Sequence, residues 1–322
     1  PLRATVDLAR CLVPLEQATG PGGGIMRLGN KAYMLARLKA LGFAVPDGFV
    51  LTTELFQARE ALATYGLLRE ELADRIRRAL APLEQSTGER YGDPASPLLL
   101  SVRGGAPISM PGMLTSFLNV GMNVEITAGL AARPGRDWAA WDAYRRFLQF
   151  WGMSHGLDRD GFDEIIRDAK QARGVPKKAL LPASSMREVA LAYRQRVLDH
   201  GVHLVEEPFA QLLACIDLVQ RSWDADYARI YRREARIAEE WGTAVIVQPM
   251  VFGNLGPSSG TGVLLTRHPQ HGSDALHLFG DVVVQGQGDD VVSGIAEPFP
   301  VSERQRRDDP RGADRSLERD FP

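Results

Sequence analysis

Apolar side chains recur at helical spacing along much of the chain, and this spacing predicts its helices. Between residues 32 and 41, the apolar positions 34, 35, 38 and 41 fall on one face of a helix, which Gly42 ends. Thr53 is placed to cap the next helix. The same pattern, with charged residues on the opposite face, predicts further helices over 54–64, 68–83, 138–151, 162–173, 185–199 and 208–236.

Short apolar runs between turn-forming residues predict the strands. Residues 45–52 form an extended segment that Pro46 and Gly48 restrict to an edge or a turn. A strand begins at Leu98, and after Trp241 the pattern changes from helical to strand-like. Strands are predicted there over 243–251, 262–266 and 281–285, with the glycine-rich stretch 253–262 as a hairpin loop between the first two. Strand-and-helix parts thus flank a helical middle, which predicts a mixed α/β protein with two lobes.

Composition and charge narrow the classes of function. The chain has 322 residues, enough for two or more subdomains, and its 44% hydrophobic and 24% charged residues are ordinary for a globular protein. The formal net charge of −2 argues against a dedicated nucleic-acid binder, and no apolar run is long enough to span a membrane. Cys11 and Cys215 lie far apart, with no metal-ligand spacing. We therefore expect a reducing, cytoplasmic setting and neither nucleic acid nor membrane as a partner.

One arginine stands out in the stretch LLLSVRGGAPISMPGM, which covers residues 98–113. An apolar strand delivers Arg103 to a loop that is rich in glycine and proline. A guanidinium offers a planar fork of donors that suits phosphate oxygens, while Gly104 and Gly105 let the backbone approach a ligand closely. The pattern predicts an anion site at a strand end. The alternative interpretation is a solvated arginine at a tight turn.

The last part of the sequence differs in composition from the rest. Residues 302–322 hold six acidic and six basic side chains and few apolar ones, so they cannot form a core by themselves. We expect this charged tail to be disordered or truncated: a linker, a loop separated from its partner, or the start of a longer helix.

Five groups of motifs carry the strongest signal for function. They read GNKA at 29–32 with LGFAVPDGF at 41–49, YGDP at 91–94 with SVRGGA at 101–106 and SMPGM at 109–113, YRRF at 144–147, GTAV at 242–245 with MVFGN at 250–254 and SGTGV at 259–263, and QGDDVVSGI at 287–295. In this order they resemble the N-terminal nucleotide-binding domain of the pyruvate phosphate dikinase family. The resemblance extends over residues 29–300, and the SMPGM form favours the dikinase over its relative phosphoenolpyruvate synthase.

This resemblance implies an ATP-grasp fold, in which two α/β lobes close on ATP. Residues 1–120 would form part of the N-terminal lobe, and residues 121–240 a helical subdomain with a return to that lobe. Residues 241–301 would form part of the second lobe, which would be incomplete. The charged tail, residues 302–322, would follow it.

The resemblance also implies a reaction and its cofactors. In the family, ATP with Mg²⁺ and inorganic phosphate phosphorylates a histidine, releasing AMP and pyrophosphate, and the phosphohistidine then converts pyruvate to phosphoenolpyruvate. The histidine domain and the barrel that binds pyruvate would be partners within a longer protein, with a homodimer forming through the barrel. We expect this chain alone to be inactive. The alternatives are a dikinase with another acceptor, as in phosphoenolpyruvate synthase, or a nucleotide-binding module without catalysis.

Two cations are the principal site residues that the resemblance implies. Lys31 matches the family's phosphate-contacting lysine, and it stands beside glycines at a predicted helix start, where the helix dipole favours phosphate. Arg103 matches the arginine that bridges the nucleotide phosphates. We expect both to act in catalysis by neutralising charge on the transferred group. Gly104 replaces the family's usual serine, and Asn30 and Thr115 also depart from its pattern.

The remaining candidates are weaker. Arg145 and Arg146 are adjacent, so a helix would point one toward phosphate and the other toward water or an acid; the resemblance favours Arg146 without deciding between them. Gln248, Met250 and Val251 match the strand whose backbone meets adenine, although the last two are equally typical of a core. Phosphate-capping backbone is expected around Thr261, metal ligation at Asp281, and metal-side roles at Gln287, Asp289 and Asp290, with the main metal ligands expected beyond residue 322.

Overall fold

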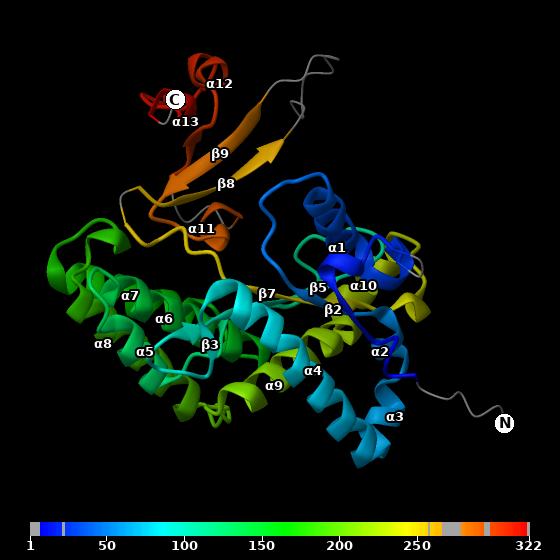
Figure 1. The fold of residues 1–322 in the computed structure, drawn as a ribbon. Helices are drawn as coiled ribbons and strands as arrows, with labels where there is room; N and C mark the ends of the chain where they lie inside the picture. Colours follow the sequence, from blue (N-terminus) through cyan, green and yellow to red (C-terminus); the bar gives the residue numbers. More distant parts are fainter. Residues whose placement is uncertain (1–6, 21–22, 257, 266–277, 293–296, 321–322) are drawn as a thin grey trace. The chain divides into compact units, whose positions relative to one another are not determined.

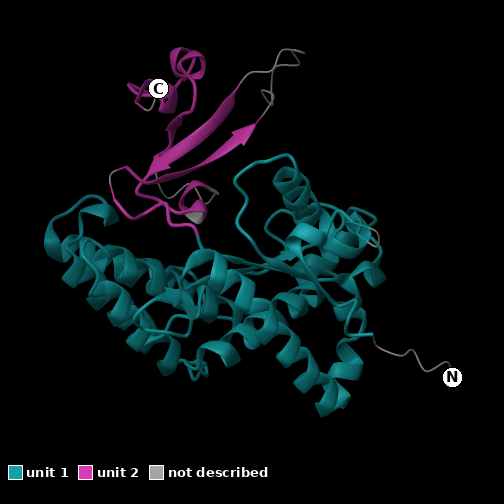
Figure 2. Cartoon of the chain, in the orientation of Figure 1, with its two compact units in different colours: residues 1–250 teal, residues 251–322 magenta. Residues whose placement is uncertain are grey.

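The computed structural model divides the chain into two compact units, residues 1–250 and residues 251–322 (Figures 1 and 2). It describes all residues except 1–6, 21–22, 257, 266–277, 293–296 and 321–322. Each unit is built around its own antiparallel sheet. The mixed helix-and-sheet class predicted from the sequence is confirmed.

The first unit is organised around a five-stranded sheet. The strand order is β1 (Leu12–Pro14), β2 (Phe49–Leu51), β7 (Ala244–Pro249), β5 (Leu100–Gly105) and β6 (Ser116–Val120). All neighbours run antiparallel. Strands β7 and β5 are apart in the sequence but adjacent in space, and this adjacency positions the residues described below.

Helices cover both faces of this sheet (Figure 1). On one face, α1 (Ile25–Ala40) buries Leu28, Ala32 and Ala36 against Val50 and Ile246. On the other face, α9 (Pro208–Arg221) packs against β5, β6 and β7. Because side chains alternate along a strand, Arg103 and Gly105 point to the α1 face, whereas Gly104 faces Val219 of α9.

A break in α1 lets it approach the sheet very closely. Gly29 has φ 73° and ψ 156°, so α1 consists of two helical segments joined at this residue. A Cβ at Gly29 would lie 2.1 Å from the carbonyl oxygen of Gly105, a distance that no side chain tolerates. The backbone N–H of Asn30 donates to the Ala106 carbonyl at 2.8 Å. The second segment therefore begins directly against the end of β5.

The remaining helices of the first unit pack around this framework, and α6 and α8 form its most extensive helix pair. A two-stranded parallel pair, β3 (Arg90–Tyr91) with β4 (Pro97–Leu98), precedes β5. The helices are α2 (Thr53–Gln57), α3 (Arg59–Thr64), α4 (Gly66–Thr87), α5 (Val124–Ala131), α6 (Asp137–Ser154), α7 (Asp160–Arg173), α8 (Ala183–Asp199) and α10 (Asp226–Glu234).

The second unit has a three-stranded antiparallel sheet in the order β10 (Phe299–Pro300), β9 (Phe279–Val284), β8 (Gly260–Leu265). Val282, Phe299 and Val301 form its small core, against which Leu317 packs. Three short helices complete it: α11 (Gly288–Val292), α12 (Glu303–Arg307) and α13 (Leu317–Asp320).

The single helix expected over 208–236 is wrong, because the chain turns in the middle of that range. A 3₁₀ turn at Ser222–Asp224 separates α9 from α10. The turn carries Trp223 into a buried cluster with Phe56 and Ile237, where it is 1% exposed. Burial of this large ring, which helical spacing does not encode, ends the helix.

Two other expectations also differ from the structure. Residues 253–262 are not a hairpin loop, because β7 pairs with β2 and β5 whereas β8 pairs with β9. Strand β2 lies inside the sheet, not at its edge, and begins only after Pro46 and Gly48. Thr266, the expected end of β8, lies outside the described residues.

The charged tail has more structure than its composition suggested. Glu303 pairs with Arg306, and its carboxylate also accepts a hydrogen bond from Ser316, whose side chain is fully buried. The backbone N–H of Glu318 donates to the Val301 carbonyl at 3.0 Å. The tail up to Asp320 thus packs against the second unit's core instead of forming a separate irregular segment.

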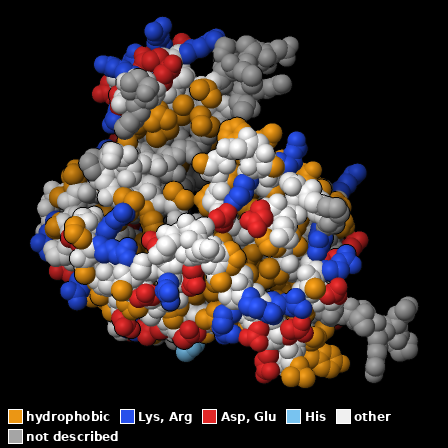
Figure 3. Space-filling model, in the orientation of Figure 1, with side chains coloured by type: hydrophobic (Ala, Val, Ile, Leu, Met, Phe, Trp, Pro, Cys, Tyr) orange, Lys and Arg blue, Asp and Glu red, His pale blue; other side chains and the backbone are white. Residues whose placement is uncertain are grey.

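Charged side chains of both signs are interspersed on the face drawn in Figure 3, in keeping with the near-neutral net charge. Across the described parts of the chain, we find no helix with both the length and the apolar character needed to cross a bilayer.

Candidate functional site

Two cations from distant parts of the sequence come together where α1 meets β5. Lys31 lies in the first turn of the second α1 segment, and its Nζ donates to the carbonyl oxygen of Gly104 at 3.2 Å. Arg103 precedes that glycine in β5. It lies inside the strand, whereas the sequence pattern predicted a position in the loop after the strand. The close approach at Gly29 brings the two side chains to the same face of the sheet.

The Arg103 guanidinium is held by a neutral group. Its Nη2 donates to Oε1 of Gln248 at 2.6 Å, and its Nε is buried without a hydrogen-bond partner among the described residues. Burial lowers the pKa of Arg103 from its ordinary value, but a guanidinium stays charged at any physiological pH. The arginine therefore keeps its full positive charge.

Like Arg103, Lys31 has a lowered pKa and a neutral hydrogen-bond acceptor, although the residue as a whole is exposed. Desolvation of its ammonium group and, to a smaller extent, repulsion from Arg103 together lower the pKa to about 8. Its one hydrogen-bond acceptor in the described structure is the Gly104 carbonyl, which carries no charge.

Neither cation pairs with a carboxylate among the described residues. Two positive charges that repel each other and contact only neutral acceptors favour the binding of an anion. A phosphate group supplies both the charge and enough oxygens for the two side chains. The arrangement can therefore bind a phosphorylated ligand and neutralise charge on it.

The backbone beside the two cations is firmly held. Gly104 is buried, and a Cβ there would lie 3.0 Å from Leu114 Cβ and 3.3 Å from Val219 Cγ1. The N–H of Gly105 donates to Oγ1 of Thr243, which is fully buried. Close packing against α9 explains why glycine stands where the family usually has serine.

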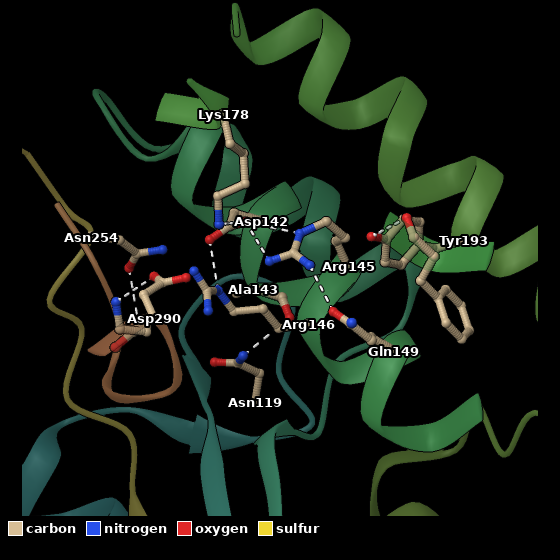
Figure 4. Close-up of polar contacts among 12 residues, drawn as sticks. Asn119, Asp142, Ala143, Arg145, Arg146, Gln149, Lys178, Tyr193, Asn254 and Asp290 are labelled. Atoms are coloured by element: carbon tan, nitrogen blue, oxygen red, sulfur yellow. Dashed lines mark hydrogen bonds and ion pairs between the residues drawn. The ribbon is translucent and has the colours of Figure 1, made fainter. Parts of the chain in front are cut away.

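Arg145 and Arg146 form a different kind of site, shown in Figure 4. Both are on α6 and nearly fully buried, and both pair with Asp142. Arg145 Nε lies 3.0 Å from Asp142 Oδ1, Arg146 Nε lies 2.8 Å from Oδ2, and Lys178 Nζ lies 3.1 Å from Oδ1. Burial would raise the pKa of Asp142, but the three cations hold it well below its ordinary value.

The expectation that the two arginines point to different surroundings is therefore wrong, whereas pairing with an acid, expected for one of them as the alternative to water contact, holds for both. Asp142 is three residues before Arg145 and four before Arg146, so one helix face presents it to both. The structure gives Arg146, our candidate for nucleotide binding, the role of an ion-pair partner inside the first unit. Lys178, from the turn before α8, completes this cluster.

The segment from Gln248 to Val251 does not offer the adenine contacts that its sequence suggested. The side chain of Gln248 is used to hold Arg103. The backbone N–H of Met250 donates to the Leu99 carbonyl at 2.8 Å, so it is not available to an adenine edge. Val251 is the first residue of the second unit and is 71% exposed.

The candidates of the second unit lie in its sheet and its loops. Thr261 is in β8, opposite Val283 of β9, rather than in a loop. Asp281 pairs with Arg311 at 2.9 Å. A carboxylate already paired with a guanidinium is a poor Mg²⁺ ligand, so the structure does not support the metal prediction for Asp281.

Other acidic residues of that unit also have protein partners. Asp290 accepts a hydrogen bond from the backbone of Gln287, whose side chain donates to Asn254 at 3.1 Å. The side chain of Asp289 lies outside the described part of the structure. In the residues that the structure describes, no three His, Cys, Asp or Glu side chains gather in a way that could hold a metal ion.

Sequence reasoning missed two residues that shape these sites. Asp142 could have been found, because an acid three and four residues before two arginines is a helical ion-pair pattern. Thr243 had no signal beyond its place in the GTAV motif. The partnership of Gln248 with Arg103 also had none, since the two are 145 residues apart in the sequence.

Comparison with known proteins gives consistent matches. The model of the family described as "Pyruvate phosphate dikinase, AMP/ATP-binding domain" matches residues 56–307. The chain is 38% identical over 287 residues to pyruvate, phosphate dikinase of Clostridium symbiosum, covering 88% of this chain and 32% of that protein. It is 41% identical over 273 residues to the chloroplastic enzyme of Mesembryanthemum crystallinum, covering 84% and 28%. The chain thus spans about a third of the length of these relatives.

Proposed function

The chain belongs to the pyruvate phosphate dikinase AMP/ATP-binding domain family, and from this premise we propose that Lys31 and Arg103 bind the phosphates of ATP. The relatives in the comparison are named as dikinases of pyruvate and phosphate. A nucleoside triphosphate agrees with the family's description as AMP/ATP-binding, and its phosphates suit a pair of adjacent cations.

A single observation carries the proposal: the two cations meet without a carboxylate in the described structure. Lys31 donates to a carbonyl and Arg103 to an amide oxygen, so both retain positive charge toward a ligand. The transfer of a phosphoryl group depends mainly on positioning and on charge neutralisation. Two cations fixed by the backbone of α1 and β5 are suited to both tasks.

The proposal for the whole protein is wider. There, ATP and inorganic phosphate would phosphorylate a histidine on another domain, with release of AMP and pyrophosphate. The phosphohistidine would then give its phosphoryl group to pyruvate, forming phosphoenolpyruvate. Mg²⁺ would accompany ATP; among the described residues, no three His, Cys, Asp or Glu side chains gather in a way that could hold it.

The test is the replacement of Arg103 by alanine in the protein at its full natural length. We expect ATP affinity to fall about a hundredfold, since a charge-assisted contact of about 2.7 kcal/mol is lost. ATP-dependent phosphorylation of the protein should be lost with it. Isothermal calorimetry measures the affinity, and labelled ATP reports the phosphorylation. Arg136→Ala is a control for the general loss of an arginine. Unchanged affinity and phosphorylation in Arg103→Ala would refute the proposal.

A further inference from the structure

Gln248 lies at the centre of the sheet, beside the proposed phosphate site. It is in β7, its Cα partner in β5 is Ser101, and its side chain is 3% exposed. Side chains alternate along β5 and β7, so Gln248 is on the same face of the sheet as Arg103. A buried amide in this position must satisfy both its donor and its acceptor.

Each end of the Gln248 amide has a partner of the matching kind. Oε1 accepts from Nη2 of Arg103 at 2.6 Å, and Nε2 donates to the carbonyl oxygen of Pro46 at 3.0 Å. The guanidinium can only donate and the carbonyl can only accept, so a single orientation of the amide satisfies both contacts. Gln248 thereby connects Arg103 to the segment that leads into β2.

The fold leaves room for this side chain at one glycine. A Cβ on Gly48 would lie 2.7 Å from Cγ of Gln248 and 2.7 Å from the carbonyl oxygen of Val247. Any larger residue at position 48 would displace the amide from its place. Gly48 and Pro46 both belong to the LGFAVPDGF motif, so this motif has a physical link to the arginine of the SVRGGA motif.

The chemistry of the amide also matters. Gln248 occupies one nitrogen of the Arg103 guanidinium without neutralising its charge. A carboxylate in the same place would pair with the arginine and reduce its attraction for phosphate, and an apolar side chain would leave the guanidinium without an anchor. A neutral acceptor of this length fixes the direction of the cation while leaving its charge for a ligand.

We propose that Gln248 is a positioning residue that holds the Arg103 guanidinium in the direction required for phosphate binding. This inference rests on the proposed function, because it assumes that Arg103 binds phosphate. It replaces the adenine role that the sequence had suggested for Gln248.

The test is a double-mutant cycle on ATP affinity, measured by calorimetry in the protein at its full natural length. Gln248→Met keeps the length and volume of the side chain, and we expect ATP to bind about tenfold more weakly, a loss of about 1.4 kcal/mol. In the background of Arg103→Met, the same change at Gln248 should have no further effect. Gln248→Glu should weaken ATP binding more than Gln248→Met, because it neutralises Arg103.

Ser101→Ala is the matched control, since it removes the hydroxyl that donates to the Gln248 backbone carbonyl and leaves the amide intact. It should bind ATP like the wild type. If Gln248→Met does not fold, Gln248→Glu takes its place: it should weaken ATP binding when Arg103 is present and have a much smaller effect in the Arg103→Met background, and an equal effect in both would overturn the inference.

The outcomes separate this inference from the proposed function. If Arg103→Met weakens ATP binding but Gln248→Met does not, Gln248 is not a positioning residue. An equal loss for Gln248→Met in both Arg103 backgrounds would also overturn the inference, because it would show a general structural effect. If Arg103→Met itself binds ATP like the wild type, the proposed function fails, and the inference fails with it.

Discussion

Two groups of cations in the first unit differ in the kind of partner that each group has. On α6, Arg145 and Arg146 share the carboxylate of Asp142. At the junction of α1 and β5, Lys31 and Arg103 meet a carbonyl and an amide instead. Both groups contain the same kinds of side chain, and both match motifs of the family. A carboxylate partner makes Arg145 and Arg146 part of the fold, whereas Lys31 and Arg103 keep their charge, as the phosphate binding that we propose for them requires.

The comparison also shows why a motif does not by itself assign a role. YRRF and SVRGGA both present arginines that the resemblance linked to nucleotide. Asp142, which stands two residues before the first of these motifs, gives its arginines a protein partner. No acidic residue in the described structure does so for Arg103.

The largest effect should come from removing the carboxylate at the α6 cluster. Asp142→Asn would leave Arg145 and Arg146 without their shared anion in a buried place, and we expect the free energy of unfolding to fall by about 3–5 kcal/mol. Urea denaturation followed by circular dichroism measures it. Arg103→Met removes a cation that has no carboxylate partner in the described structure and leaves only the neutral amide of Gln248 without its donor, so it should lower the free energy of unfolding by about 1–2 kcal/mol. Equal losses in the two variants would remove the distinction between the clusters.

A slightly smaller loss of stability should follow from a substitution that pushes α1 away from the end of β5. Gly29→Ala would place a Cβ against the Gly105 carbonyl at a positive φ, and we expect a loss of about 3 kcal/mol in the free energy of unfolding. Gly42→Ala is the matched control, because Gly42 also has a positive φ but nothing within 4 Å of its added Cβ. It should lose only about 1 kcal/mol. If Gly29→Ala costs no more than the control, the close approach is not what positions Lys31.

The pH dependence of ATP binding should report the charge of Lys31. Its pKa is lowered to about 8, so the free protein loses this charge as the pH rises above 8, while bound phosphate favours the protonated form. ATP affinity should therefore be constant below pH 7 and fall by up to about tenfold per pH unit above pH 8. Calorimetry between pH 6.5 and about 9.5 covers this range. Lys31→Arg should flatten the profile; an identical profile in that variant would mean that another group titrates.

The same shift has a consequence for stability with the opposite sign. The folded-state pKa of Lys31 lies below the ordinary value of 10.5, so the unfolded chain binds more protons between about pH 8 and 10.5. The contribution of this group to stability therefore rises with pH in that window, while ATP binding falls. The residue is exposed, so we expect the change in stability to be small because of screening by solvent.

The smallest effect should come from Gly104. Gly104→Ala adds one methyl group at 3.0 Å from Leu114 Cβ, and we expect a loss of about 1 kcal/mol in the free energy of unfolding with ATP affinity changed less than about threefold. Thermal unfolding and calorimetry on one preparation test both parts. A large loss of ATP affinity without a loss of stability would instead assign Gly104 to ligand contact.

The sequence predicted the helices best where they lie on the surface. The expected ranges 162–173 and 185–199 are close to α7 (Asp160–Arg173) and α8 (Ala183–Asp199), because an amphipathic period of 3.6 encodes a helix with one buried face. The sequence did not predict the features that depend on contacts between distant residues. The turn at Trp223 depends on a pocket formed with Phe56, and the pairing of β7 with β5 depends on segments far apart in the sequence.

In the candidate site, too, local patterns in the sequence were informative and distant contacts were not. Motif spacing suggested Lys31 and Arg103, and the structure brings them to one face of the sheet. The partners of these cations could not be read from the sequence, because Gln248 is 145 residues from Arg103 and the Gly104 carbonyl has no sequence signature. Asp142 was within reach of helical spacing alone.

The most direct test of the central claim is a crystal structure of the protein at its full natural length with a non-hydrolysable ATP analogue. We expect phosphate oxygens within hydrogen-bond distance of both Lys31 Nζ and the Arg103 guanidinium, with the amide of Gln248 unmoved. An analogue bound with its phosphates away from both side chains would contradict the account.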